Sequence, residues 1–116
     1  MKILYIEDNQ DTAEAVRIIL TKASFDIGIA NSGKKAIEIL TKENFDLILI
    51  DIMLPDMSGW DIFEILKKKK INSKIAFLSA IPVSEERLEE LKKAGVSDYI
   101  TKPFSKEDLI NRIRKI

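Results

Sequence analysis

The sequence contains no cysteine and no histidine. These absences exclude a disulfide scaffold, a Cys/His zinc site and nucleophiles activated by a histidine. They also mean that the chain cannot itself carry a phosphohistidine. Any acid–base or metal chemistry must therefore come from carboxylates, lysine, hydroxyl groups or tyrosine.

A surplus of charge and a long apolar run are lacking as well. Lys+Arg and Asp+Glu each number 19, so the net charge is zero, whereas a dedicated nucleic-acid or anionic-membrane binder needs a basic surplus. No run approaches the ~20 apolar residues that span a bilayer. The apolar stretch 1–6 is too short, and too soon followed by acidic residues, for a signal peptide. We therefore expect a cytoplasmic protein that contacts neither nucleic acid nor membrane directly.

The chain has the size and composition of one domain, which we expect to span residues 1–116. Its apolar share of 46% is sufficient for a single core. Five short segments have the pattern of β-strands, at 3–6, 25–29, 46–50, 75–78 and 98–101. The first, third and fourth are almost wholly apolar, which is typical of strands buried on both faces, and the other two suit sheet edges.

Apolar residues at helical spacing follow each of these five segments. The stripes are Ala13, Val16, Leu20 and Ala23; Ala36, Ile37 and Leu40; Ile62, Ile65 and Leu66; Leu88, Leu91 and Ala94; Leu109, Ile110 and Ile113. Gly95 is expected to close the fourth helix, and Ser105 to cap the fifth with Asp108 at the capping-box position. Strict alternation of this kind predicts a parallel sheet with helices on both faces and right-handed crossovers.

Polar and charged side chains follow four of the predicted strands. In an open α/β sheet, ligands bind beyond the carboxyl ends of the strands. The residues found there are Glu7 and Asp8, Asp51, Ser79, and Lys102 with Pro103. We therefore expect three carboxylates, a hydroxyl and an ammonium group to meet at one edge of the sheet.

Three carboxylates in one cleft repel each other unless a cation lies among them. Oxygen ligands favour a hard ion, and a few carboxylates with water suit Mg²⁺. With Lys102 nearby, a carboxylate could act as a nucleophile toward phosphorus while the two positive groups neutralise the phosphoryl oxygens. Each feature alone has an ordinary explanation as a turn, a cap or a solvated amine. Their agreement at four strand ends makes a site the better interpretation.

The sequence resembles the receiver domains of two-component response regulators, including the chemotaxis type, from Lys2 to Ile116. The motifs are Ile-Glu-Asp-Asn at 6–9, Asp-Leu-Ile-Leu-Ile-Asp-Ile-Met-Leu-Pro at 46–55, Met-Ser-Gly-Trp at 57–60, Leu-Ser-Ala at 78–80, Ala-Gly-Val at 94–96 and Asp-Tyr-Ile-Thr-Lys-Pro-Phe at 98–104. The resemblance implies a flavodoxin-like, doubly wound (βα)5 sandwich with strand order 2-1-3-4-5.

The resemblance also implies roles for the residues at the predicted edge. Asp51 matches the aspartate that is phosphorylated, and Lys102 the lysine that binds the phosphoryl group. Asp8 matches the direct Mg²⁺ ligand, and Glu7 the ligand that often acts through water. Met53 is expected to offer its backbone carbonyl to the metal.

Further roles concern the switch that reads out phosphorylation. Ser79 matches the hydroxyl that follows the phosphoryl group, and Tyr99 the aromatic residue that rotates inward with it. The peptide bond before Pro103 is expected to be cis. Met53 and Ile81, two positions beyond Asp51 and Ser79, are apolar and cannot position a hydrolytic water, so we expect a long-lived acyl phosphate.

By the same resemblance, the phosphoryl donor is a sensor histidine kinase or a histidine phosphotransfer protein. Phosphorylation would shift the population of a two-state surface formed by the fourth helix, fifth strand and fifth helix. The protein would catalyse its own phosphorylation and dephosphorylation without being an enzyme for an external metabolite. The downstream effector is unknown, and both a monomer and a phosphorylation-induced homodimer stay open.

Four other interpretations are weaker. A nucleotide hydrolase would need a P-loop, which 28–35 nearly spells, but Lys35 stands where Ser or Thr must reach Mg²⁺. An aspartate-nucleophile phosphatase usually needs an acid where Met53 stands. A flavin-binding protein needs a Ser/Thr/Gly-rich loop at 7–11, which is acidic here. A pseudo-receiver that acts only as an interaction module would lack one of the acidic or lysine positions, and all are present.

Overall fold

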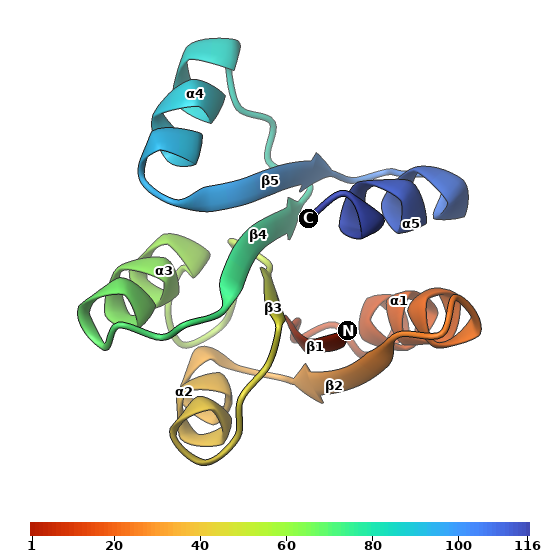
Figure 1. Ribbon diagram of the computed structural model, residues 1–116, viewed down its shortest axis with the longest axis horizontal. Coiled ribbons are helices and arrows are strands. Elements are labelled where there is room, and N and C mark those ends of the chain that lie inside the picture. The colour runs from red at the N-terminus through yellow and green to blue at the C-terminus, as the bar shows by residue number, and fades with distance from the viewer.

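Five parallel strands alternate with five helices in the computed structural model, which describes residues 1–116 (Figure 1). The strands are β1 (Lys2–Ile6), β2 (Asp26–Ala30), β3 (Leu47–Ile50), β4 (Lys74–Ser79) and β5 (Val96–Thr101), and the helices are α1 (Gln10–Lys22), α2 (Gly33–Lys42), α3 (Gly59–Lys68), α4 (Glu85–Lys93) and α5 (Lys106–Arg114). The strand order is β2-β1-β3-β4-β5, which confirms the predicted doubly wound sheet.

The hydrophobic pattern explains the order of the strands. Every residue of β3 is buried, as expected for a strand covered on both faces, while β2 and β5 lie at the two edges. The predicted fifth strand starts too late, because β5 begins at Val96 rather than at residue 98. Val96 pairs with Ile75, but the register shifts after this pair, and Ser97 interrupts the apolar pattern.

The helices form two layers. Figure 1 shows α1 and α5 on one face of the sheet and α2, α3 and α4 on the other. Alternate residues of β1 serve the two cores: Ile3 and Tyr5 pack toward α1 and α5, whereas Leu4 and Ile6 belong to the opposite core. The burial of both faces holds the carboxyl ends of the central strands in place.

Every helix begins with a polar cap. The side chain of each N-cap residue accepts a hydrogen bond from the backbone N–H three positions later; these residues are Asn9, Ser32, Ser58, Ser84 and Ser105. Such a cap stabilises a helix by about 1 kcal/mol. Gly95 follows the last residues of α4 at φ +111°, a conformation that suits glycine. Each helix runs antiparallel to the strand before it. All five helix N-termini therefore lie near the carboxyl ends of the strands, where the site is predicted.

None of the helices combines the length and apolar character needed to cross a membrane.

Candidate functional site

Strand pairing brings the three predicted carboxylates together. β1 and β3 are neighbours, with Ile6 opposite Ile50, so the residues that follow them leave the sheet side by side. The backbone N–H of Asp51 donates to the carbonyl of Ile6 at 3.1 Å. Carboxylate oxygens of Glu7, Asp8 and Asp51 lie within 4.8 Å of one another. The expected acidic cluster is therefore present at the carboxyl edge of the sheet.

Lys102 reaches this cluster from β5, although β4 separates β5 from β3. Its backbone N–H donates to the carbonyl of Ser79 at 2.8 Å, which continues the β4–β5 pairing past the end of the sheet. Its ammonium Nζ lies 2.7 Å from Glu7 Oε1 and 3.4 Å from Asp51 Oδ2. The peptide bond between Lys102 and Pro103 is cis.

Glu7 is the most enclosed of the carboxylates, with 2% of its surface exposed. Its Oε1 accepts from Lys102 and from the Tyr5 hydroxyl at 2.8 Å, and its Oε2 accepts from the Asn9 backbone at 3.3 Å. Burial acts to raise the pKa of Glu7, but hydrogen bonds from Lys102, Asp51 and Tyr5 lower it below its usual range. The carboxylate of Glu7 therefore stays ionised beside Lys102.

The surroundings of Asp51 shift its pKa in the opposite direction. Burial raises the pKa of Asp51 to about 6, and the adjacent Glu7 carboxyl group contributes to the rise, while Lys102 and the Met53 backbone N–H oppose it. The three carboxylates exceed the single ammonium group by two negative charges. The local electrostatics therefore favour a divalent cation, and the all-oxygen donor set fits a hard ion such as Mg²⁺.

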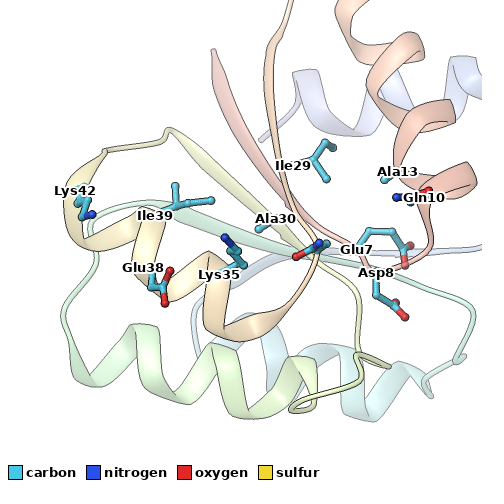
Figure 2. Close-up of a pocket in the computed structure, with 11 residues that line it drawn as sticks. Glu7, Asp8, Gln10, Ala13, Ile29, Ala30, Lys35, Glu38, Ile39 and Lys42 are labelled. Carbon is cyan, nitrogen blue, oxygen red and sulfur yellow. The ribbon is translucent and has the colours of Figure 1, made fainter.

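Asp8 is exposed and gives the cluster its opening to solvent. Figure 2 shows Glu7 and Asp8 at one end of a shallow groove between α1 and α2. Lys35 and Lys42 of α2 line the groove farther along. Because Asp51 and Lys102 are not among its lining residues, the groove lies beside the acidic cluster and is not the site itself.

The loop after β3 is fixed at several points. The backbone N–H of Met53 donates to Asp51 Oδ1 at 3.3 Å, and that of Gly59 donates to the Ile52 carbonyl at 2.8 Å. A Cβ on Gly59 would lie 2.6 Å from the backbone oxygen of Asp51, so only glycine allows this approach. The Met53 side chain is 69% exposed, and the role expected of its carbonyl stays a prediction.

Asp56, which the sequence analysis did not single out, anchors the same loop to α2. Its two carboxylate oxygens accept from the backbone N–H groups of Gly33 at 3.0 Å and Lys34 at 2.9 Å. The backbone N–H of Lys34, helped by that of Gly33, lowers the pKa of Asp56. In the sequence, the only available signal was an aspartate in a turn-like Pro-Asp-Met-Ser-Gly segment.

This contact also excludes the nucleotide-hydrolase interpretation. Gly28 lies inside β2, Ser32 caps α2, and the amides that a P-loop would turn toward phosphate are bound to Asp56. The segment 28–35 therefore forms an edge strand and an ordinary helix start.

The two predicted switch residues lie on the far side of Asp51 from Glu7. Ser79 is in β4 and Tyr99 is in the neighbouring strand β5. Ser79 is buried at the end of β4, and its Oγ accepts from the Ile81 backbone N–H at 3.2 Å. Tyr99 is buried too, and its hydroxyl donates to the Ile81 carbonyl. The Tyr99 ring packs against Phe77 and Trp60, at centroid distances of 6.0 and 6.4 Å. Both residues are thus hydrogen-bonded to Ile81, while their roles as a switch stay predictions.

Comparison with known proteins agrees with this architecture. The family model of the response regulator receiver domain matches residues 3–114. The transcriptional regulatory protein CusR of Escherichia coli K12 is 36% identical over 116 residues, which are 100% of this chain and 51% of that protein. The cell cycle response regulator CtrA of Brucella ovis is 35% identical over 116 residues, covering 100% and 50%. The chain thus spans about half the length of these curated relatives.

Solved structures agree as well. The receiver domain of the Francisella response regulator 1452 is similar at a TM-score of 0.88 and 35% identity, covering 98% of this chain and 93% of that one. The response regulator TrrA of Thermotoga maritima, solved in complex with Mg(2+)-BeF, is similar at a TM-score of 0.83 and 26% identity, covering 98% and 96%. The chain therefore belongs to the response regulator receiver domains of two-component systems.

Proposed function

We propose that this receiver domain is a phosphoacceptor switch in which Asp51 takes a phosphoryl group from a phosphohistidine in a Mg²⁺-dependent reaction. The observation that carries the proposal is the meeting of the Glu7, Asp8 and Asp51 carboxylates within 4.8 Å, with the Lys102 ammonium 3.4 Å from Asp51. A pseudo-receiver would have no reason to hold these four groups together at an electrostatic cost.

Each residue of the cluster has a distinct part in this proposal. Asp8 and Asp51 would hold the cation directly, Glu7 through water, and Met53 through its backbone carbonyl. The bound cation would neutralise negative charge on the phosphoryl oxygens. A carboxylate oxygen of Asp51 bonds to phosphorus while the bond from phosphorus to the imidazole nitrogen breaks, and the imidazole keeps the electron pair. Lys102 donates to a phosphoryl oxygen once it leaves Glu7.

The relatives support this assignment of metal and partner. TrrA was solved with Mg(2+)-BeF, and CusR is named as a transcriptional regulator. By analogy, the partners of this domain are a sensor histidine kinase or histidine phosphotransfer protein on the input side and an effector protein or attached effector domain on the output side. The output can also be a homodimer that forms when the domain is phosphorylated. We place the receiver domain itself at residues 1–116.

Ile81 offers a route from the phosphoryl group to the output surface. Its backbone N–H donates to Ser79, and its carbonyl accepts from Tyr99. If the Ser79 hydroxyl turns toward a phosphoryl group on Asp51, the backbone at Ile81 must adjust, and Tyr99 with it. Phosphorylation would then shift the population of two arrangements of α4, β5 and α5.

The acyl phosphate is expected to last, because Met53 and Ile81 offer no polar atom in their side chains to orient a water molecule. Replacing both, in Met53→Asn/Ile81→Gln, should shorten its lifetime in a decay assay. An unchanged or longer lifetime in that double variant would contradict this part of the proposal.

Incubation with acetyl phosphate tests the proposed function directly. Intact-protein mass spectrometry should show the addition of one phosphoryl group with Mg²⁺ and none when the metal is chelated. Asp51→Asn should abolish the addition, whereas Asp56→Asn, the same change in the same loop, should retain it. Phosphorylation that survives Asp51→Asn or metal removal would refute the proposal.

A further inference from the structure

Tyr5 contributes the only polar atom among the buried side chains of the core beneath α1 and α5. Its side chain has no exposed surface, and its phenol oxygen lies 2.8 Å from Glu7 Oε1. A buried hydroxyl that lacks a partner is costly, so this contact is needed for the core as well as for Glu7. Burial raises the pKa of Tyr5, which keeps the phenol protonated as a donor.

The geometry of β1 explains how a core residue can reach the acidic cluster. Side chains two positions apart on a strand point to the same face, so Tyr5 and Glu7 leave β1 in the same direction. Glu7 then bends back over the end of the core to meet the phenol. Its Oε1 accepts from Tyr5 and from Lys102 at the same time, at 2.8 and 2.7 Å.

The length of the side chain at position 7 fits this arrangement. Glutamate has one more methylene than aspartate, and it reaches the phenol on one side and the ammonium of Lys102 on the other. Its second oxygen, Oε2, is turned to the backbone N–H of Asn9. The carboxylate is thus held by three donors and is not free to swing toward a cation as Asp8 is.

We propose that Tyr5 is a positioning residue of the phosphoacceptor site. Its hydroxyl fixes the carboxylate of Glu7, which keeps Glu7 an indirect metal ligand and holds Lys102 beside Asp51 before a phosphoryl group arrives. This inference rests on the proposed function for its effect on Mg²⁺, but not for the pairing of Tyr5 with Glu7. A purely structural tyrosine would stabilise the core without any energetic link to metal binding.

A double-mutant cycle on Mg²⁺ affinity separates the two roles. Mg²⁺ is titrated by calorimetry into the wild type, Tyr5→Phe, Glu7→Ala and the double variant. We expect Tyr5→Phe to weaken Mg²⁺ binding about tenfold, as loss of an outer-shell partner does. In the Glu7→Ala background, where no side chain is left for Tyr5 to position, the same change should have no further effect. Additive losses, or an unchanged affinity in Tyr5→Phe, would overturn the proposal.

Ile3→Val is the matched control for a disturbed core. Ile3 lies in the same strand and the same core as Tyr5 and is equally buried, but its side chain has no polar atom with which to hydrogen-bond to the site. This variant should lose stability and keep the wild-type Mg²⁺ affinity. A tenfold loss of affinity in Ile3→Val would show that any damage to this core impairs the metal site. That result would refute a specific role for Tyr5.

A second cycle needs no metal. Glu7→Asp shortens the side chain and leaves the buried Tyr5 hydroxyl without a hydrogen-bond partner. The thermal midpoint in Mg²⁺-free buffer should therefore fall by about 4 °C. Tyr5→Phe/Glu7→Asp should recover most of that fall, because no buried hydroxyl is left unpaired. A double variant that melts lower than Glu7→Asp would refute the pairing. If the wild type binds no Mg²⁺, the proposed function fails, and this thermal cycle still decides whether Tyr5 positions Glu7.

Discussion

Two aspartates of one loop, Asp51 and Asp56, have opposite environments. Asp51 is buried next to Glu7, and burial raises its pKa to about 6. Asp56 is exposed, accepts two backbone N–H groups at the start of α2, and has a lowered pKa. The ionised form is therefore disfavoured at the first position and favoured at the second.

The difference shows how one chain uses the same side chain for chemistry and for structure. A carboxylate with satisfied hydrogen bonds gains little from a cation or an electrophile, so Asp56 serves as an anchor. A carboxylate crowded by Glu7 is stabilised by any cation that offsets its negative charge, so Asp51 gains most from bound Mg²⁺. Four measurements can test this contrast between Asp51 and Asp56.

The largest effect is expected for Asp51→Asn. Phosphorylation by acetyl phosphate should be lost completely, because the nucleophilic oxygen is gone. The free energy of unfolding without metal should rise by about 1 kcal/mol, since a disfavoured charge is removed. Urea denaturation in chelator measures this change. A variant that is less stable than the wild type would contradict the description of Asp51 as electrostatically strained.

The pH dependence of Mg²⁺ binding should follow Asp51. Because its pKa in the metal-free domain is raised to about 6, protons compete with the cation below that pH. The affinity should fall roughly tenfold per pH unit below about 6 and become constant above about 7. Calorimetric titrations from pH 5 to 8 measure the profile, and Asp51→Asn should flatten it. A wild-type profile that is flat across this range would show that Asp51 is already ionised at pH 5.

Gly59, which lies against the backbone of Asp51, and Gly33, which donates to Asp56, should differ in how well they tolerate replacement by alanine. A Cβ at Gly59 would lie 2.6 Å from the backbone oxygen of Asp51, so Gly59→Ala should cost about 2–3 kcal/mol of stability. A Cβ at Gly33 would lie 2.5 Å from the side chain of Met57, which can move, so Gly33→Ala should cost less than about 1 kcal/mol. Equal losses in denaturant titrations would mean that the backbone near Asp51 is no more constrained than the start of α2, which Asp56 contacts.

Asp56→Asn should have the smallest effect of the four. One charge-assisted hydrogen bond to the start of α2 is lost, while the amide oxygen can still accept the other. The free energy of unfolding should fall by about 1 kcal/mol, and phosphorylation should persist. Loss of phosphorylation at unchanged stability would reverse the roles assigned to the two aspartates.

The sequence predicted the sheet well because its signals are local. The apolar runs at 3–6, 46–50 and 75–78 mark buried central strands, and the helical stripes between them fix the alternation. The predicted start of β5 was wrong. Pairing with β4, and not the side-chain pattern, extends that strand back to Val96 past a register shift.

The candidate site was predictable only in part. Residues that follow neighbouring strands must meet at one edge, which is why Glu7, Asp8 and Asp51 could be named together. The residues that fix their loop or hydrogen-bond to them could not be predicted in the same way. Asp56 meets α2 through a tertiary contact across 23 positions of sequence, and no local pattern encodes it. Tyr5 was detectable in principle, because it is a hydroxyl-bearing residue on the same strand face as Glu7, but it also fits a plain core position.

Chemical trapping of the modified residue identifies the carboxylate that accepts the phosphoryl group. After reaction with acetyl phosphate and Mg²⁺, borohydride reduces an acyl phosphate to the corresponding alcohol, and peptide mass spectrometry then locates the reduced side chain. Reduction is expected at position 51 alone, and only when Mg²⁺ was present. Reduction at Glu7, Asp8 or Asp56, or equal reduction at position 51 without the metal, would contradict the proposed role of Asp51.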